Sequence, residues 1–200
     1  DYLKLTEYDV LILPGGDYPF SDNKEAMDKI KSFIRQGGKV ISIENAVQQL
    51  AQGNFGFSLK EAKEDTGTDS AADYSLLKKY GQRDRDYLKN SIPGAIYKLT
   101  LDNTHPLAFG YPDFYYTLKL NTGLYNYMKN GWNVGALKKS NYTSGFVGSI
   151  LKPELQDGTL IGATNYGQGN IIFFADDPLF RLFWQNGKLM FSNAVFLVGE

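Results

Sequence analysis

Near the start of the chain, the fold is indicated by the sequence Tyr8-Asp9-Val10-Leu11-Ile12-Leu13-Pro14-Gly15-Gly16. Its apolar run from Val10 to Leu13 is continuous rather than alternating, which favours a parallel strand covered on both faces. Pro14-Gly15-Gly16 then predicts a turn where this strand ends. We therefore expect the chain to begin as an α/β domain.

The following residues repeat the pattern of strand and helix. Asp22 and Glu25 predict the start of a helix and Gly37-Gly38 its end, and apolar residues fall at helical spacing between them. A second buried strand is expected at Lys39–Ile43, and a short helix carries the apolar residues from Ala46 to Ala51. Strand, helix, strand and helix in this order predict a parallel sheet with a right-handed crossover.

The rest of the chain divides into a charged part and a β-rich part. Residues 58–91 are rich in charge, and we expect a surface insertion there with one helix near Tyr74 to Tyr80. The last helix is expected at about Lys188 to Val198. The strands between them are expected at Ala95–Leu101, Tyr115–Leu120, Trp132–Leu137, Thr159–Thr164 and Asn170–Ala175. The pattern predicts one domain over residues 1–200, a flavodoxin-like α/β three-layer sandwich with a mainly parallel central sheet.

Composition limits the chemistry that the 200 residues can perform. The chain has no cysteine and one histidine, His105, which excludes a thiolate zinc site, a cysteine nucleophile and a His-rich metal centre. We therefore expect no cofactor in this chain. A net charge of −1 provides no strong field to attract a nucleic acid. Purely apolar runs are far shorter than the ~20 residues of a membrane span, so none is expected.

One pattern in the first fifty residues consists of Leu13-Pro14-Gly15-Gly16, the expected helix after this turn, and the segment from Val40 to Ala46. This pattern resembles the class I glutamine amidotransferase-like superfamily, which includes the DJ-1/PfpI group. In enzymes of that superfamily the nucleophile lies on a sharp strand-to-helix elbow. The resemblance places Glu44 at this elbow, where cysteine would be expected. No histidine occurs in Phe173–Asp177, the stretch that matches the catalytic histidine of the amidotransferases. Glutamine hydrolysis by the family mechanism is therefore excluded.

A more specific pattern lies in three later segments. They are Ile92–Tyr97, Leu101–Tyr111, and Gly167–Phe174 followed by Asp177–Arg181. They resemble the amidotransferase-like domain that follows the catalytic domain in bacterial M14-type zinc carboxypeptidases. The resemblance implies a catalytically degenerate accessory domain of a larger peptidase that removes C-terminal residues. It further implies a secreted or periplasmic protein, an upstream peptidase domain as partner, and zinc held only in that domain. The chain would be a C-terminal fragment, because the family domain begins with a further βαβ unit before Tyr8.

The residues that could form a site are those at the expected carboxyl edge of the sheet, together with the only histidine. They are Gly15, Gly16, Glu44, Asn45, His105, Asp176 and Asp177.

Each candidate has a structural interpretation beside the functional one. The Glu44 carboxylate could be stabilised at a helix N-terminus by roughly 0.3–1 kcal/mol, or it could bind a peptide or a small polar ligand. Gly15-Gly16 could supply backbone donors or only form the turn. His105 could be a hydrogen-bonded structural residue or a base, and Asp177 before Pro178 could cap a turn. The alternative function is a stand-alone hydrolase that uses Glu44 and His105.

Aromatic residues are frequent between positions 111 and 142. We expect most of them to pack in the core and the sheet, although they could instead form a face on which a sugar or a peptide stacks. They are Tyr111, Phe114, Tyr115, Tyr116, Tyr125, Tyr127, Trp132 and Tyr142.

Overall fold

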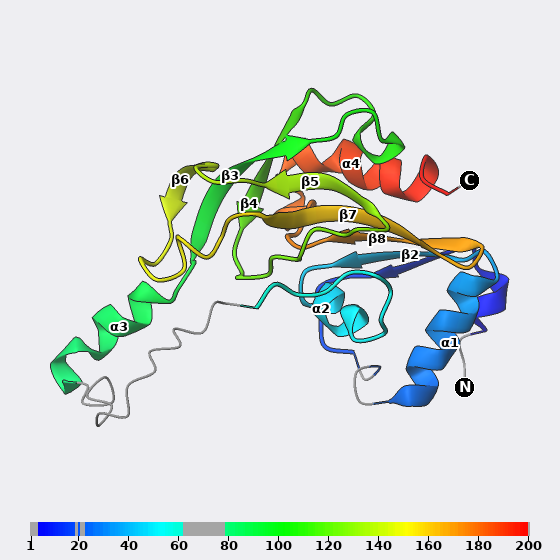
Figure 1. Ribbon diagram of the computed structural model, residues 1–200, viewed down its shortest axis with the longest axis horizontal. Helices are drawn as coiled ribbons and strands as arrows, with labels where there is room; N and C mark the ends of the chain where they lie inside the picture. The colour runs from blue at the N-terminus through cyan, green and yellow to red at the C-terminus, as the bar shows by residue number, and fades with distance from the viewer. Residues whose placement is uncertain (1–3, 19, 21–22, 62–78, 200) are drawn as a thin grey trace.

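The computed structural model describes residues 4–18, 20, 23–61 and 79–199 (Figure 1). Its strands are β1 (Val10–Leu13), β2 (Lys39–Ile43), β3 (Gly94–Leu101), β4 (Phe114–Lys119), β5 (Trp132–Leu137), β6 (Tyr142–Phe146), β7 (Gly158–Tyr166) and β8 (Gly169–Phe174). Its α-helices are α1 (Lys24–Arg35), α2 (Asn45–Ala51), α3 (Arg83–Lys89) and α4 (Gln185–Phe196). Short 3-10 turns occur at Leu5–Glu7, Tyr80–Gln82, Pro106–Ala108 and Phe180–Leu182.

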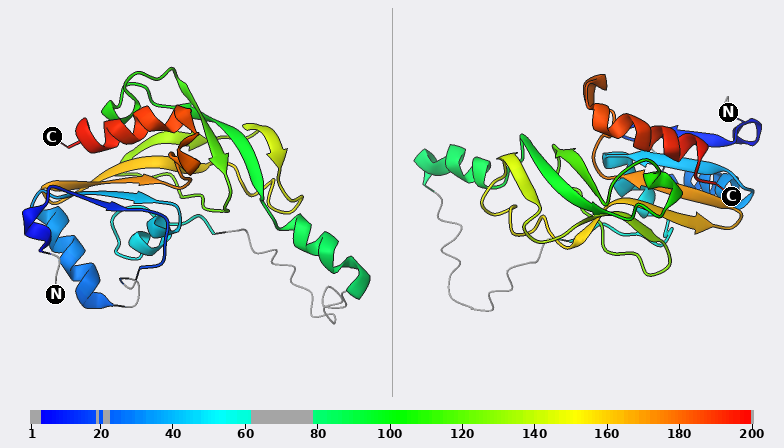
Figure 2. Two further views of the ribbon diagram at one scale, coloured as in Figure 1. Left: turned by 180° about the vertical axis from the view of Figure 1, so that it is seen from behind. Right: turned by 90° about the horizontal axis from the view of Figure 1, so that it is seen from above.

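The described strands form one sheet between two layers of helices. The strand order is β1-β2-β8-β7-β5-β3-β4, and β6 pairs with β3. Helices α1 and α2 cover one face of the sheet and α4 covers the other, as Figure 1 and Figure 2 show. The α/β layered architecture expected from the sequence is therefore present.

The sheet is mixed, and the expectation of a mainly parallel sheet is wrong. Only the β1–β2 and β2–β8 pairs are parallel, whereas the β8–β7, β7–β5, β5–β3, β3–β4 and β3–β6 pairs are antiparallel. The cause lies in the connection between β7 and β8, where Tyr166 pairs with Gly169 across a turn of two residues. So short a connection can join only antiparallel strands.

The turn between β7 and β8 packs on the end of α1. Gly167 has a φ of 67°, which glycine adopts without strain, and a Cβ at Gly169 would collide with the carbonyl oxygens of Gly38 and Ile34. These glycines allow β8 to lie directly beside β2, with Ile41 opposite Ile172. Ile41 and Ile172 are both completely buried.

The second half of the sheet curls back over the carboxyl ends of the parallel strands. Lys119, the last residue of β4, contacts Asp176 just after β8, although β3, β5 and β7 separate the two strands in the sheet. Strand β4 alternates in burial, so that Tyr115, Thr117 and Lys119 all point inward. The curl therefore brings a buried lysine to the edge where β1, β2 and β8 end.

Other expectations differ from the structure in detail. The helix after β1 is capped by Asn23, whose side chain accepts a hydrogen bond from the Ala26 N–H, whereas Asp22 lies outside the described residues. Most of the helix expected near Tyr74 to Tyr80 also lies outside them, and α3 begins only at Arg83. Strand β6 was not expected. Among the described residues, no helix is both long and apolar enough to cross a membrane.

Candidate functional site

A sharp elbow joins β2 to α2 at Glu44. This residue has φ 52° and ψ −128°, a conformation that costs a non-glycine residue roughly 1–3 kcal/mol. Its N–H donates to the Phe174 carbonyl at 2.8 Å, which extends the pairing of β2 with β8, and its carbonyl accepts from the Val47 N–H at 3.1 Å. The backbone thus turns from strand to helix within one residue, as the sequence predicted for this position.

The Gly15-Gly16 turn after β1 is fastened to the first turns of α2. The Gly16 N–H donates to Asn45 Oδ1 at 2.7 Å, and Gln49 Nε2 donates to the Gly16 carbonyl at 2.8 Å. Gln49 Oε1 also accepts from the Tyr18 N–H at 2.7 Å. Because Asn45 already occupies the Gly16 N–H, this donor does not point at a substrate oxyanion. The structure thus gives Gly16 and Asn45 a role in shaping the turn.

The Glu44 carboxylate lies against the same turn. A Cβ at Gly15 would collide with Glu44 Oε2, so a side chain there and the present position of Glu44 are incompatible. The Glu44 side chain makes no capping hydrogen bond to α2. The interpretation of Glu44 as a carboxylate stabilised by the helix N-terminus therefore lacks the contact on which it depends.

The electrostatics around Glu44 oppose its negative charge. Burial raises the pKa of the Glu44 carboxyl, and the charges of Asp177 and Asp176 raise this pKa further. A carboxyl group with this environment takes up a proton more readily than one in water. Its chemical use is as a hydrogen-bonding group or a weak acid, because a carboxylate cannot replace the thiolate nucleophile of the elbow.

Asp176 lies in a buried ionic cluster that the sequence analysis did not find. Lys119 Nζ lies 3.1 Å from Asp176 Oδ1, and the Thr117 hydroxyl donates to Asp176 Oδ2 at 2.9 Å. The Lys119 side chain is fully buried and also donates to the Gly123 carbonyl at 2.5 Å. Burial raises the pKa of Asp176, while Lys119 and Thr117 act in the opposite direction. Asp176 is thus held by contacts within the core.

Asp177 and His105 have the structural contacts that the sequence favoured for them. Asp177 Oδ1 accepts from the Leu179 N–H at 2.8 Å, which caps the turn after β8. His105 Nδ1 accepts from the Leu107 N–H at 3.1 Å and begins the 3-10 turn Pro106–Ala108. Burial lowers the pKa of His105, so the imidazole is neutral at pH 7.

The structure brings Gly15, Gly16, Glu44, Asn45 and the Asp176-Asp177 pair to one edge of the sheet, but it does not bring His105 there. His105 borders a cavity that Asn170, the second residue of β8, also lines. The Glu44 N–H is hydrogen-bonded to Phe174, at the other end of that strand. At about 3.3 Å per residue, roughly 13 Å of strand separates the two ends. Glu44 and His105 therefore cannot act on the same bond of a small substrate.

The elbow has carboxylates but lacks the other groups of an amidotransferase site. The chain has no thiol, and its one imidazole lies at the opposite end of β8. Within the described ranges, no three His, Cys, Asp or Glu side chains form a group that could hold a metal ion. What the edge offers is a partly buried carboxyl beside a rigid glycine turn, which suits hydrogen bonding rather than covalent catalysis.

Comparison with known proteins supports the fold but not a particular activity. No protein-family model matches the sequence, and no curated protein matches it. Among solved structures, a ThuA-like protein from Bacteroides uniformis has a TM-score of 0.55 at 16% identity, covering 96% of this chain and 69% of its own. A glutamine amidotransferase from Thermotoga maritima has a TM-score of 0.55 at 12% identity, covering 97% and 79%.

The same fold also occurs as a part of a much longer chain. A β-galactosidase from Bacillus circulans sp. alkalophilus matches 98% of this chain with a TM-score of 0.52 at 11% identity, and the match covers 23% of the galactosidase. Identities this low show the fold alone. The chain has an α/β fold of the class I glutamine amidotransferase-like type.

Proposed function

We propose that the chain is a catalytically degenerate amidotransferase-like domain that serves as an accessory module of a larger exported zinc metallocarboxypeptidase. The observation that carries the first half of this proposal is the elbow itself. Glu44 occupies the nucleophile position with the backbone conformation of the elbow, and the Gly16 N–H is bonded to Asn45. An elbow that keeps its geometry although its donor is already engaged and its nucleophile is replaced by a carboxyl group supports a structural role.

The second half of the proposal, the carboxypeptidase parent, rests on the three segments that resemble the M14-associated domain. In the structure they form the start of β3, the His105 loop, the turn before β8 with β8 itself, and the turn after β8. The β-galactosidase match supports the general point that this fold can be one module of a larger enzyme. The parent would remove C-terminal residues from peptides, with zinc held in its catalytic domain.

Uncovered apolar surface beside the parallel strands supports a contact with further polypeptide. Strand β1 is an edge strand that pairs with β2, and its Ile12 side chain is 39% exposed. On the face covered by α4, Phe196 is 81% exposed. We propose that an upstream βαβ unit of the same polypeptide adds a strand beside β1 and a helix beside α4, because edges of parallel sheets are normally covered.

The proposal is tested on the native protein rather than on this chain alone. An antibody raised against the purified chain is used to isolate the polypeptide from its source, and its mass, its zinc content and its release of C-terminal amino acids from a peptide are measured. We expect a longer polypeptide with one zinc ion and carboxypeptidase activity. A longer polypeptide without zinc, or one that does not release C-terminal residues, would contradict the proposal.

The stand-alone hydrolase was the competing function, and the geometry does not favour it. It needs Glu44 and His105 in one site, and these residues lie at opposite ends of β8. An assay of glutamine and ester hydrolysis by the purified chain separates the two functions. Turnover that is lost in both Glu44→Gln and His105→Ala would favour the hydrolase.

A further inference from the structure

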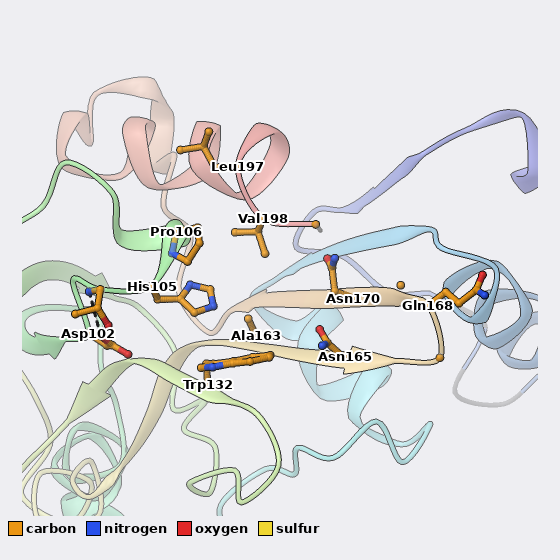
Figure 3. Close-up of a pocket in the computed structure, with 14 residues that line it drawn as sticks. Asp102, His105, Pro106, Trp132, Ala163, Asn165, Gln168, Asn170, Leu197 and Val198 are labelled. Carbon is orange, nitrogen blue, oxygen red and sulfur yellow. Dashed lines mark hydrogen bonds between the residues drawn. The ribbon is translucent and has the colours of Figure 1, made fainter.

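A cavity of about 400 Å³ lies at the end of the sheet opposite to Glu44 (Figure 3). It is bordered by the β7–β8 hairpin, by the segment that follows α4 and by the loop that carries His105. Its volume falls within the range of about 300–1,000 Å³ that is usual for small-molecule sites. The residues of the elbow do not line it, so it is distinct from the site described above.

An unsatisfied polar atom is the first sign that the cavity takes a ligand. Asn170 lines the cavity, and its Oδ1 is buried without a hydrogen-bond partner. A buried acceptor left unpaired costs about 1–3 kcal/mol, and a small rotation of the amide towards a donor in the cavity removes this cost. Asn165 lies directly opposite Asn170 on β7, so two side-chain amides stand side by side on one wall, as Figure 3 shows.

His105 supplies a fixed donor on the facing side. Because Nδ1 accepts from the Leu107 N–H, the neutral imidazole carries its proton on Nε2. The imidazole ring also packs against the Trp132 ring, with 5.7 Å between the ring centroids. In Figure 3 the His105 ring points into the cavity, so its Nε2–H is directed where an acceptor could bind.

Trp132 provides a flat apolar surface between these polar groups. Its side chain is 46% exposed although it lies in a strand, and Figure 3 shows the ring lying along one side of the cavity, with Val198 across from it. A half-exposed indole beside amides and an imidazole combines an apolar face with surrounding hydrogen-bonding groups. Ligand sites typically have this combination.

The lining of the cavity does not favour an anionic ligand. Among the described residues that line it there is no lysine or arginine, and the one acidic residue is Asp102. Asp102 Oδ1 already accepts from the Thr104 N–H at 3.1 Å and from the Thr104 hydroxyl at 2.6 Å. A phosphate or a carboxylate would enter without a counter-charge, which is unfavourable away from water. The lining therefore favours a ligand without negative charge.

We propose that the cavity binds a neutral sugar. The C–H face of the sugar ring would lie on Trp132, one hydroxyl would bond to the amide pair of Asn165 and Asn170, with the Asn170 amide turned towards it, and another would accept from His105 Nε2–H. A sugar fits better than a nucleobase because the polar groups come from the two hairpin strands and from the His105 loop, and they reach the cavity from different directions. Hydroxyls project from a sugar ring in many directions, whereas the donors and acceptors of a base lie in one plane.

The first experiment uses Trp132 as its own reporter. The chain has two tryptophans, so in the Trp184→Phe variant Trp132 is the only one. Its fluorescence is titrated with glucose, galactose, mannose and N-acetylglucosamine, and with adenosine and inorganic phosphate as comparisons. We expect a saturable change with at least one sugar and none with phosphate.

The second experiment separates binding from folding. Asn170→Ala should weaken sugar binding about tenfold in calorimetry, the value of a lost hydrogen bond, without lowering the melting temperature, because Oδ1 has no partner in the free protein. The matched variant is Asn193→Ala. Asn193 is a buried asparagine whose Nδ2 donates to the carbonyls of Leu107 and Phe109, so this variant should lose stability. Trp132→Ala should weaken binding more than tenfold.

Three results would overturn the proposal. The first is the lack of a saturable response to all four sugars. The second is sugar binding that persists unchanged in both Asn170→Ala and Trp132→Ala, which would place the sugar elsewhere. The third is saturation by adenosine without saturation by any sugar, which would assign the cavity to a nucleobase.

Discussion

The Lys119–Asp176 pair gives the most quantitative prediction. Lys119→Met keeps the length and apolar stem of the side chain but removes its charge, so Asp176 remains in the core with only the Thr117 hydroxyl as a partner. Removing one partner of a buried ion pair typically costs 3–5 kcal/mol. Protonation of Asp176 limits the cost. Protonating a carboxylate with an ordinary pKa near 3.9 costs about 4 kcal/mol at pH 7, at 1.36 kcal/mol per pH unit.

We therefore expect Lys119→Met to lose about 4 kcal/mol at pH 7 in urea unfolding followed by circular dichroism. For a chain of this size this corresponds to a fall of about 10 °C in the melting temperature. The loss should shrink as the pH is lowered towards 4, because the unpaired carboxyl then binds its proton without cost. The double variant Lys119→Met/Asp176→Leu should recover most of the stability, since neither charge remains to be desolvated.

Two results would refute this reasoning. One is a melting temperature of Lys119→Met within about 2 °C of the wild type, which would mean that the pair is not buried as described. The other is a double variant that is no more stable than the single one. Thr117→Val serves as the control, because it removes one neutral hydrogen bond to Asp176 and should cost only about 1 kcal/mol.

Three further predictions concern the strands, the elbow and zinc. Ile41→Asp puts an unpaired charge into a fully buried central strand and should cost several kcal/mol, and an unchanged melting temperature would contradict the placement of β2. The folded-state pKa of Glu44 is raised, so the carboxyl favours folding at low pH and loses this contribution as the pH rises. Glu44→Gln should therefore match the stability of the wild type at pH 4 and slightly exceed it at pH 7. The difference should be less than about 1 kcal/mol, because the group is partly exposed. A less stable Glu44→Gln at pH 7 would show that the carboxylate is stabilised instead. Elemental analysis should find no stoichiometric zinc in the purified chain, and Glu44→Cys should release no ammonia from glutamine, because no histidine lies beside the elbow.

The local signals of the first fifty residues predicted the structure well. β2 was expected at Lys39–Ile43 and lies there, and the Glu44 elbow and the helix after it follow as expected. Continuous apolar runs, a helical stripe and glycine stops act over a few residues, so a single sequence reveals them. Strand direction is different, because it depends on which strands become neighbours. The expected strands at Thr159–Thr164 and Asn170–Ala175 were found as β7 and β8, but their antiparallel pairing depended on the two-residue turn between them.

The site was predicted only where its residues follow the strands in sequence. Gly15, Glu44 and Asp176 could be placed at one edge because each comes directly after a parallel strand. Lys119 could not be placed there, since it lies 57 residues from Asp176 and reaches it only through the curl of the sheet. One signal was available: Lys119 continues the inward alternation of Tyr115 and Thr117 on β4. A lysine in phase with buried residues needs a buried partner.

The central position of β8 has a consequence for the order in which the chain can fold. β8 fills the place between β2 and β7, yet it is made long after β2, so the first two strands must wait for their third neighbour. At a synthesis rate of 5–20 residues per second the delay is on the order of 10 s. During this time the β2 edge, with Ile41 and Ile43, has no partner on that side. Pairing between segments so distant in sequence closes late and slowly, so the newly made N-terminal half is the part most exposed to misassociation on the ribosome.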